Sequence, residues 1–357
     1  MTHRVPPTGI LVLECTLRDG SYTNNFGFTV KDTREICSAL EKAGFKMIEI
    51  GHGVGLNASN CGYGQAAETD EAYLAAAAET ITTSSFGMFC IPGIARLEDI
   101  DLAAKYKMDF IRIGTNVTEV ENAAPFVERA KHHGMYVTAN LMKSYVLGPK
   151  IFAQRAKLAE SYGVDLLGIV DSAGGMLPED IEHYFCATRD ICQLRLGFHG
   201  HNNLGMAVSH SLRAIDLGAE VIDTSLQGLG RGGGNAPTEM VVALLQRRSF
   251  NIGIDPIDVS DVAEQFIRPL VQKRGISSID VISGMSQFHS SYTGVIRKFA
   301  SQYNIDPRML IMAVTQFDKV NAPDALVEKV AKKLKDKPPR IPFSQFSLWN
   351  YFGDEQR

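Results

Sequence analysis

No stretch of the sequence approaches the roughly 18 consecutive apolar residues that a membrane-spanning helix requires, so we expect no membrane span. Residues 1–9 are polar and contain proline, and they lack the apolar segment of a secretory signal. The six cysteines include no C-x-x-C pair, and four of them fall in apolar stretches, where a buried free thiol is the usual state. Together these absences favour a cytoplasmic location.

An excess of charge of one sign is also absent. The chain of 357 residues carries 36 Lys and Arg against 40 Asp and Glu, a formal net charge of −4. The first basic block occurs only at Lys332 to Lys337, so we expect no nucleic-acid partner. Apolar residues make up 45% of the chain, which is enough for one large globular domain and an appendage.

Short strand-like segments alternate with helical patterns up to Arg248. The strand candidates are Ile10–Leu17, Lys46–Gly51, Ser84–Cys90, Met108–Thr115, Tyr136–Met142, Val164–Asp171, Arg195–Asn202 and Glu220–Leu226. Between them, apolar residues recur at three- and four-residue spacing, which predicts amphipathic helices. Eight such units predict an α/β fold of the (β/α)₈ TIM-barrel type. The alternative, an open doubly wound sheet, needs a glycine-rich turn after its first strand, and Arg18-Asp19-Gly20-Ser21 is not one.

The pattern changes after Arg248. Consecutive helices with short turns are predicted at Val259–Lys273, Tyr292–Tyr303, Pro307–Phe317 and Ala325–Leu334. The end of the chain contains several prolines and the only tryptophan, Trp349, which is typical of an extended tail. We therefore predict a catalytic barrel domain (residues 1–262), a small C-terminal all-helical domain (263–335) and an extended tail (336–357).

Polar residues gather where the predicted strands end, the edge at which such barrels carry their active sites. His199 and His201 lie two apart in the seventh strand, so their side chains share a face, with Cα atoms roughly 6.5–7 Å apart. Asp19 ends the first strand, which barrel closure sets near the seventh and eighth. Asn235 follows the eighth and can add an amide oxygen or hold a bound water. An H-x-H pair alone is common by chance, but this donor set without sulfur suits a six-coordinate Mn²⁺ or Mg²⁺.

Further charged and polar residues fall at the same edge. Arg18 stays protonated at working pH, and we expect it to stabilise an enolate or carboxylate oxygen, the alternative being a structural salt bridge. Arg231, in a glycine-rich loop, can meet an anion, and Ser172 can orient substrate. Lys143 offers a rival, metal-free mechanism, in which it forms a Schiff base with a carbonyl substrate. Alternatively, Lys143 is an exposed surface lysine without a catalytic role.

Three motifs carry a resemblance to a known superfamily. They are Thr16-Leu17-Arg18-Asp19-Gly20, Phe198-His199-Gly200-His201-Asn202-Asn203-Leu204-Gly205 and Gly230-Arg231-Gly232-Gly233-Gly234-Asn235-Ala236-Pro237. They resemble the signature of metal-dependent lyases and synthases that include 3-hydroxy-3-methylglutaryl-CoA lyase, isopropylmalate and homocitrate synthases, and 4-hydroxy-2-oxovalerate aldolase. Over about residues 10–335 the chain is most similar to the last, notably at His52-Gly53-x-Gly55-Leu56, Ile91-Pro92-Gly93-Ile94 and Ser290-Ser291-Tyr292.

The resemblance implies a class II pyruvate aldolase, which cleaves or forms a 4-hydroxy-2-oxoacid and yields pyruvate and an aldehyde. It implies a divalent metal on Asp19, His199, His201 and Asn235, with Mn²⁺ favoured over Mg²⁺ and Co²⁺, and a small-molecule 2-oxoacid held by Arg18. Acyl-CoA condensation or lyase chemistry of the same superfamily is the alternative. Against it, the acidic-Gln pair of the synthases and the loop cysteine of the lyase are absent. A non-catalytic binding protein is a third reading.

The chain departs from the aldolase pattern at three positions. Tyr22 occupies the place of the aldolases' histidine base, and the ordinary pKa of tyrosine is about 10. We therefore expect the proton to be moved by Tyr22, assisted by the metal, or by His52 or His289. Val54 replaces an acidic residue. His289 replaces a tyrosine of the pocket wall, where we expect it to contact substrate together with Ser172.

The resemblance also bears on partners. The similar aldolases pass their aldehyde to an acylating aldehyde dehydrogenase through the helical domain. Such a dehydrogenase, and a second copy of the chain in a homo-oligomer, are the partners that the resemblance allows.

Overall fold

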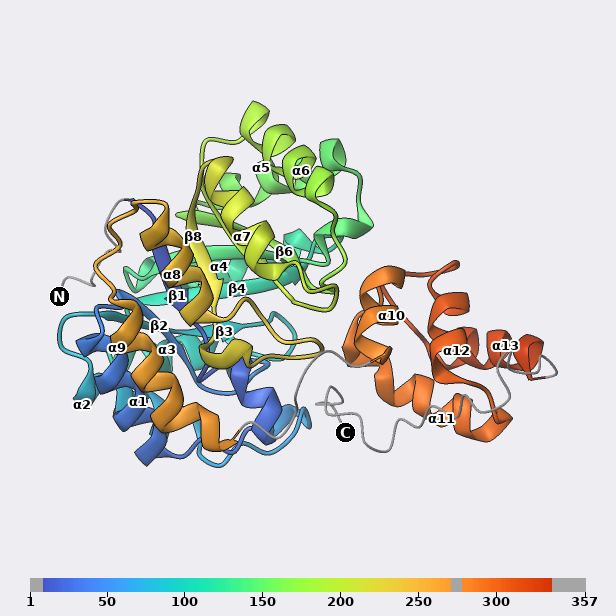
Figure 1. The fold of residues 1–357 in the computed structure, drawn as a ribbon, viewed down its shortest axis with the longest axis horizontal. Coiled ribbons are helices and arrows are strands. Elements are labelled where there is room, and N and C mark those ends of the chain that lie inside the picture. Colours follow the sequence, from blue (N-terminus) through green and yellow to red (C-terminus); the bar gives the residue numbers. More distant parts are fainter. Residues whose placement is uncertain (1–8, 271–277, 336–357) are drawn as a thin grey trace.

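In the computed structural model, which describes residues 9–270 and 278–335, eight parallel strands close into a barrel (Figure 1). The strands are β1 (Leu11–Glu14), β2 (Met47–Ile50), β3 (Ser85–Cys90), β4 (Phe110–Asn116), β5 (Tyr136–Met142), β6 (Leu166–Asp171), β7 (Arg195–Gly200) and β8 (Ala219–Thr224). The barrel closes where β1 pairs with β8, with Leu11 opposite Val221 and Glu14 opposite Thr224. The predicted TIM barrel is confirmed.

Eight helices surround the barrel, one after each strand (Figure 1). They are α1 (Val30–Lys42), α2 (Asp70–Thr80), α3 (Leu97–Lys105), α4 (Ala124–His132), α5 (Pro149–Ser161), α6 (Pro178–Ile191), α7 (Ala207–Asp216) and α8 (Thr238–Arg247). Local sequence sets their ends. At the start of α1, for example, the Thr29 hydroxyl accepts from the Asp32 amide while the Asp32 carboxylate accepts from the Thr29 amide, a capping box.

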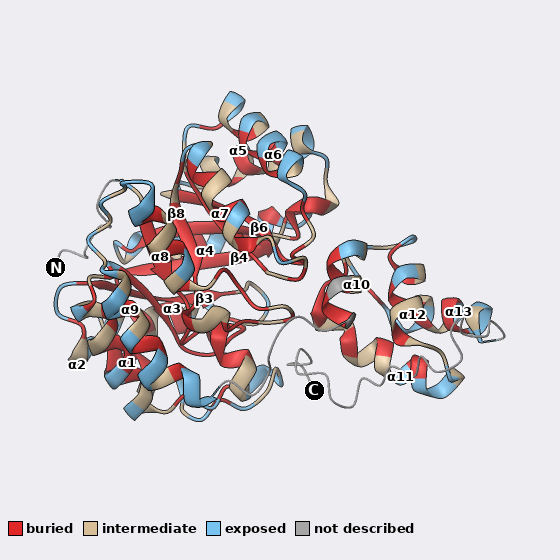
Figure 2. Ribbon diagram, viewed as in Figure 1, coloured by how far each residue is buried: buried red, intermediate tan, exposed pale blue. Residues whose placement is uncertain are grey.

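The barrel interior changes from apolar to charged along its axis, while both faces of the strands are buried (Figure 2). An apolar cluster fills one end and consists of Leu11, Leu13, Cys15, Met47, Phe110, Tyr136, Leu166 and Val221. Side chains two residues apart share a face of a strand. The next inward positions after Met47, Phe110 and Val221 are therefore Glu49, Arg112 and Asp223, which form a charged layer beneath the C-terminal mouth.

The helices that follow the barrel form two groups. The first, α9 (Pro256–Val262), continues into a π-helical turn (η6, Ala263–Ile267) and packs into the barrel's hydrophobic core. The second group is α10 (Ser278–Ser286), α11 (Thr293–Tyr303), α12 (Pro307–Val314) and α13 (Asp324–Leu334), which share a separate apolar core and lie beyond the mouth of the barrel (Figure 1). Helices at the C-terminus are thus confirmed, whereas the predicted domain boundaries stay predictions.

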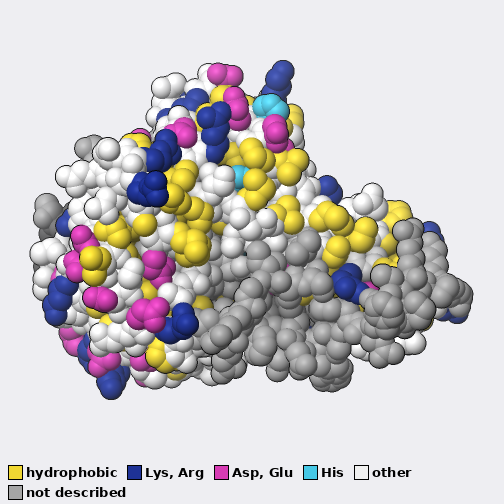
Figure 3. Space-filling view, in the orientation of Figure 1, with side chains coloured by type: hydrophobic (Ala, Val, Ile, Leu, Met, Phe, Trp, Pro, Cys, Tyr) yellow, Lys and Arg dark blue, Asp and Glu magenta, His cyan; other side chains and the backbone are white. Residues whose placement is uncertain are grey.

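Several exclusions made from the sequence can be compared with the structure. Over residues 9–270 and 278–335, no helix is both long and apolar enough to cross a membrane. All six cysteines are free, and four of them are buried. On the face drawn in Figure 3, basic and acidic side chains are interspersed over the barrel. The predicted tail, residues 336–357, lies outside the described residues.

Candidate active site and metal centre

A cavity of about 290 Å³ lies at the C-terminal ends of the strands, and its outer wall is formed by residues preceding α11. Seven of the predicted site residues line it: Arg18, Asp19, Tyr22, Ser172, His199, His201 and His289. His52 and Asn235 are not among the lining residues. The structure therefore brings most of the predicted site into one cavity.

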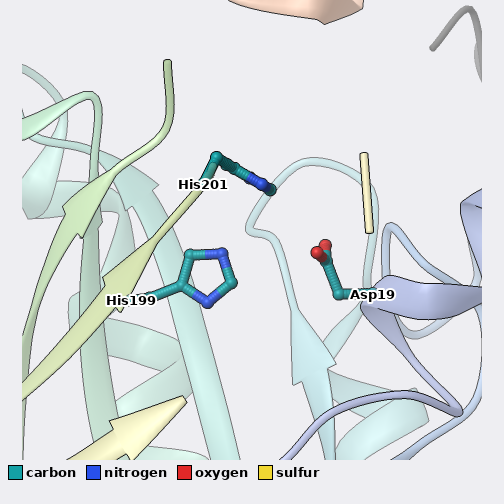
Figure 4. A group of neighbouring side chains, drawn as sticks. All are labelled: Asp19, His199 and His201. Atoms are coloured by element: carbon teal, nitrogen blue, oxygen red, sulfur yellow. The ribbon is translucent and has the colours of Figure 1, made fainter. Parts of the chain in front are cut away.

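Asp19, His199 and His201 form a compact group at the base of this cavity. One ligand atom from each lies within 4.8 Å of the other two, and all three residues are buried. Figure 4 shows the two imidazoles, from β7 and the residue that follows it, facing the Asp19 carboxylate across a gap. Asp19 lies in a 3₁₀ turn (η1, Asp19–Asn24) rather than in β1, which ends at Glu14.

Both histidines are held in the form that a metal ligand needs. The Nδ1 of His199 lies 2.9 Å from an oxygen of Asp223, and the Nδ1 of His201 lies 3.3 Å from the carbonyl oxygen of Gly234. These acceptors favour a proton on Nδ1, which leaves Nε2 as the nitrogen available to a metal. Burial lowers the pKa of His201 to about 3, so its ring is neutral near pH 7.

A network of buried charges connects the two sides of the group. Arg18 contacts Asp19 through NH1 at 2.7 Å and Glu49 through Nε at 2.8 Å. Arg112 contacts the same Glu49 at 2.9 Å and also pairs with Asp223, the partner of the histidine in β7. Three carboxylates face two guanidinium groups, which leaves one negative charge in excess.

The donor set and its electrostatics fit a divalent cation. Burial by itself raises the pKa of Asp19, but the charge of Arg18 lowers it below its ordinary value. The centre therefore offers one ionised carboxylate and two imidazole lone pairs beside a network of net negative charge. Nitrogen and oxygen donors without sulfur are typical of Mn²⁺ and related ions.

Asn235 lies directly behind the carboxylate. Its amide nitrogen donates to Asp19 Oδ2 at 2.6 Å and to the Leu229 carbonyl at 3.1 Å. This side chain fits because residue 230 is glycine: a Cβ there would lie 2.6 Å from the Asn235 amide nitrogen. Asn235 is therefore placed to position the Asp19 carboxylate, and its direct ligation of a metal stays a prediction.

The structure places His52 away from the cavity. Its Nδ1 accepts from the Val54 amide at 3.0 Å, its Nε2 lies 3.2 Å from the Gly64 carbonyl, and its ring stacks on Phe26 at 3.9 Å. Burial lowers its pKa to about 4. With both nitrogens engaged by the backbone, His52 holds the β2–α2 loop and offers the cavity no base.

His289 lines the cavity, but its nitrogens are not arranged as a base. Nδ1 lies 3.2 Å from an Arg231 nitrogen and 3.3 Å from the Ser291 amide, and both of these groups only donate. The ring proton is therefore on Nε2, which can donate to a ligand. Burial and the charges of Arg231 and Lys143 hold the pKa of His289 well below its ordinary value.

Tyr22 is the remaining candidate for moving the proton. It is buried and lines the cavity, and the Arg231 guanidinium carbon lies 5.7 Å from its ring centroid. A nearby cation favours the ionised form of a phenol.

Lys143 is only 4% exposed, so the surface-lysine alternative is wrong. Its Nζ donates to the Val320 carbonyl at 2.7 Å and to the Tyr292 hydroxyl at 3.1 Å, and its backbone amide donates to Ser172 Oγ at 2.9 Å. Burial and the charge of Arg231 lower the pKa of this lysine to about 8. Ser172 thus lines the cavity and also fixes the backbone that carries Lys143.

Sequence reasoning missed the charged layer of Glu49, Arg112 and Asp223. A signal was present, because each directly follows two apolar residues inside a strand candidate, where a charge is rarely tolerated without a partner. It also missed that Tyr292, more than a hundred residues from Lys143 in the chain, contacts it.

Comparisons with known proteins agree with this geometry. The family model described as HMGL-like matches residues 10–266. Oxaloacetate decarboxylase from Mycobacterium tuberculosis is 41% identical over 302 residues, which is 84% of this chain and 88% of that protein. 4-Hydroxy-2-oxovalerate aldolase from Carboxydothermus hydrogenoformans is 34% identical over 326 residues, 91% of this chain and 97% of that protein.

Among solved structures, the N-terminal domain of a putative aldolase from Bacteroides vulgatus has a TM-score of 0.66 at 23% identity and covers 87% of this chain and 97% of that one. At this identity the likeness shows the fold. The sequence relatives show more, and the superfamily resemblance is confirmed: the chain belongs to the HMGL-like family and is a carbon–carbon lyase.

Proposed function

We propose that this protein is a divalent-metal-dependent pyruvate aldolase, which cleaves the C3–C4 bond of a 4-hydroxy-2-oxoacid to pyruvate and an aldehyde, or forms that bond in reverse. The observation that carries the proposal is the buried group of Asp19, His199 and His201 beside Arg18 in a lined cavity. Sequence relatives named 4-hydroxy-2-oxovalerate aldolase support it.

Asp19, His199 and His201 would hold the cation, for which we propose Mn²⁺ because the donors are nitrogen and oxygen. A bound cation supplies Lewis-acid polarisation of the 2-keto group and fixes the orientation of the 2-oxoacid.

Arg18 stabilises the charge that develops when the C3–C4 bond breaks. Its guanidinium is held by Glu49 on one side and by Asp19 on the other, so it is already oriented before substrate arrives. Although burial alone lowers its pKa, these carboxylates raise it above the ordinary value, and Arg18 stays charged. Removing one such preorganised donor typically lowers kcat by about 10²–10³-fold.

Tyr22 moves the proton. As the phenolate it takes the proton of the C4 hydroxyl, the C4–O bond becomes the carbonyl of the aldehyde, and the C3–C4 electron pair enters the enolate. The phenol then returns the proton to C3, which gives pyruvate. Arg231 lies beside the Tyr22 ring, with its guanidinium carbon 5.7 Å from the ring centroid.

A second candidate reaction is the decarboxylation of oxaloacetate. No histidine base faces the cavity among the described residues, because the nitrogens of His52 and the Nδ1 of His289 are engaged. Loss of CO₂ breaks the same C3–C4 bond and yields the same enolate, but no hydroxyl proton has to be removed first. A relative named oxaloacetate decarboxylase is 41% identical to the chain.

Pyruvate release distinguishes the two reactions. The Mn²⁺-loaded protein is incubated with 4-hydroxy-2-oxopentanoate or with oxaloacetate, and pyruvate is measured with lactate dehydrogenase and NADH. The Asp19→Ala variant gives the background, since oxaloacetate also decays without enzyme. Release from the hydroxyacid supports the aldolase, and release from oxaloacetate alone supports the decarboxylase. No release above background from either substrate contradicts both.

We further propose a cytoplasmic location, supported by the six free cysteines, and two protein partners suggested by family resemblance, an acylating aldehyde dehydrogenase and a second copy of the chain. Size-exclusion chromatography with light scattering, on the protein alone and mixed with such a dehydrogenase, tests the two associations. Elution of the protein as a monomer in both runs contradicts them.

A further inference from the structure

Three cationic side chains line the cavity: Arg18, Lys143 and Arg231. Arg18 is neutralised by two buried carboxylates. Lys143 and Arg231 differ, because within the part of the chain that the structure describes neither makes a salt bridge to a carboxylate. Two cations of the described residues thus line the cavity without a salt bridge.

Arg231 has hydrogen-bonding capacity to spare. Its Nε is buried and has no hydrogen-bond partner within residues 9–270 and 278–335, and its NH1 meets only the neutral ring of His289 at 3.2 Å. A guanidinium presents its donors in a planar fork that matches a carboxylate. Arg231 is therefore suited to a carboxylate ligand.

Lys143 is held beside this open position. Its Nζ bonds are to neutral oxygens, those of Val320 and Tyr292. Its backbone φ of 55° lies in the left-handed region, which is unfavourable for a non-glycine residue, yet the position is occupied by lysine and fixed by Ser172. The charge of Arg231 also reaches Lys143 strongly enough to lower its pKa.

The charges of Lys143, which is buried, and Arg231, which is partly buried, repel each other, and an anion that contacts both removes the repulsion. In the proposed function the C1 carboxylate of the 2-oxoacid lies at the metal group beside Arg18, so another anion has to meet Lys143 and Arg231. The distal end of 4-hydroxy-2-oxopentanoate is an uncharged methyl group, so this substrate would not bring a negative charge to Lys143 and Arg231 either.

We propose that Arg231 and Lys143 form a second anion subsite that binds a distal carboxylate, so that the preferred substrate is a dicarboxylic 2-oxoacid. This inference rests on the proposed function and names its substrate class. Oxaloacetate and a 4-hydroxy-2-oxo-dicarboxylate such as 4-hydroxy-2-oxoglutarate share this chemistry.

Calorimetric titration with two unreactive acids tests the subsite. 2-Oxoglutarate and 2-oxopentanoate have the same carbon chain and differ in the distal carboxylate, and neither has a C4 hydroxyl or a carboxyl group that is lost with C3–C4 cleavage. Charge-assisted hydrogen bonds predict that the Mn²⁺-loaded protein binds 2-oxoglutarate at least ~10-fold more tightly. Equal affinities overturn the proposal.

Variants assign the preference to the two residues. Arg231→Gln and Lys143→Met should each reduce the preference to less than ~3-fold, Arg231→Lys should retain most of it, and Arg213→Gln, on the exposed face of α7, should leave it unchanged. A full preference in both Arg231→Gln and Lys143→Met overturns the assignment. Pyruvate, titrated into each variant, reports whether the Arg18 end of the cavity is intact.

The failures of the two proposals are distinguishable. Wild-type protein that binds pyruvate but shows no preference contradicts the subsite and leaves the proposed function standing, whereas protein that binds no pyruvate contradicts the proposed function. Turnover then identifies the dicarboxylate. A higher kcat/KM for 4-hydroxy-2-oxoglutarate than for 4-hydroxy-2-oxopentanoate supports an aldol substrate, turnover of oxaloacetate alone supports decarboxylation, and a preference for the monocarboxylate overturns the subsite.

Discussion

Asp223 links the buried charges of the barrel to a proposed metal ligand, and its replacement by asparagine tests the centre without touching a ligand atom. The carboxylate lies 2.9 Å from His199 Nδ1 and also pairs with Arg112. Asp223→Asn removes one of the three carboxylates, so the network loses its excess negative charge. The partner of the histidine becomes a neutral amide, which can turn its NH₂ group toward Nδ1 and so no longer fixes the tautomer.

The expected loss of Mn²⁺ affinity is about 10–100-fold, the usual effect of removing a partner that orients a metal-bound histidine. This corresponds to about 1.4–2.7 kcal/mol. The fold should survive, because Arg112 keeps its contact with Glu49 and is not left as an unpaired buried charge, which would cost about 3–5 kcal/mol.

The assay is a Mn²⁺ titration in which the electron paramagnetic resonance signal of the free ion reports how much Mn²⁺ remains unbound. Asp216→Asn is the matched control, since it makes the same chemical change at a partly exposed ion pair with Arg248. If Asp223→Asn stays folded and binds Mn²⁺ as tightly as wild type, the role given to this network is wrong.

Three further predictions follow from the same contacts. Tyr22→Phe should lower kcat on a 4-hydroxy-2-oxoacid by at least ~100-fold with little change in KM, because the phenol moves the proton; a near-normal rate in the pyruvate-release assay contradicts this role. Borohydride added with pyruvate should leave the protein mass unchanged, and an adduct on Lys143 would support the Schiff-base route instead. Burial holds the pKa of His201 at about 3, against about 6.5 in the unfolded chain, so the unfolded state binds more protons between these values and stability falls as pH drops. Urea denaturation of the metal-free protein between pH 6 and pH 4 measures this loss. The free energy of unfolding should fall more steeply with decreasing pH in wild type than in His201→Asn, by up to about 1.4 kcal/mol per pH unit, and equal slopes would refute the prediction.

Much of the fold was predictable because each repeating unit carries its own signal. Apolar periodicity indicated most of the helices, and strand candidates within a few residues of the observed bounds gave the barrel count. The alanine-rich α2 gives a weak signal of this kind, because small apolar residues cover several of its faces and leave no distinct apolar stripe.

The metal-binding group was predictable for a geometric reason. His199 and His201 share a face of β7, and closure of the barrel between β8 and β1 brings Asp19 close to them. The end of β1 was less predictable. Its strand stops at Glu14 because that carboxylate binds the amide and hydroxyl of Thr16 and so turns the chain.

The rest of the site depends on contacts that are remote in sequence. The setting of His52 could not be predicted, because its two partners, Val54 and Gly64, act through backbone groups whose positions only the folded loop defines. The partners of Lys143 likewise lie in the C-terminal helical segment, 149 and 177 residues further along the chain.

A crystal of the protein soaked with Mn²⁺ and oxalate, an unreactive mimic of the pyruvate enolate, gives the most direct measurement. Anomalous scattering from manganese should appear as one peak between Asp19, His199 and His201, with oxalate in contact with Arg18. Ordered protein with no anomalous peak at these three side chains would contradict the assignment of this cavity as a metal-dependent lyase site.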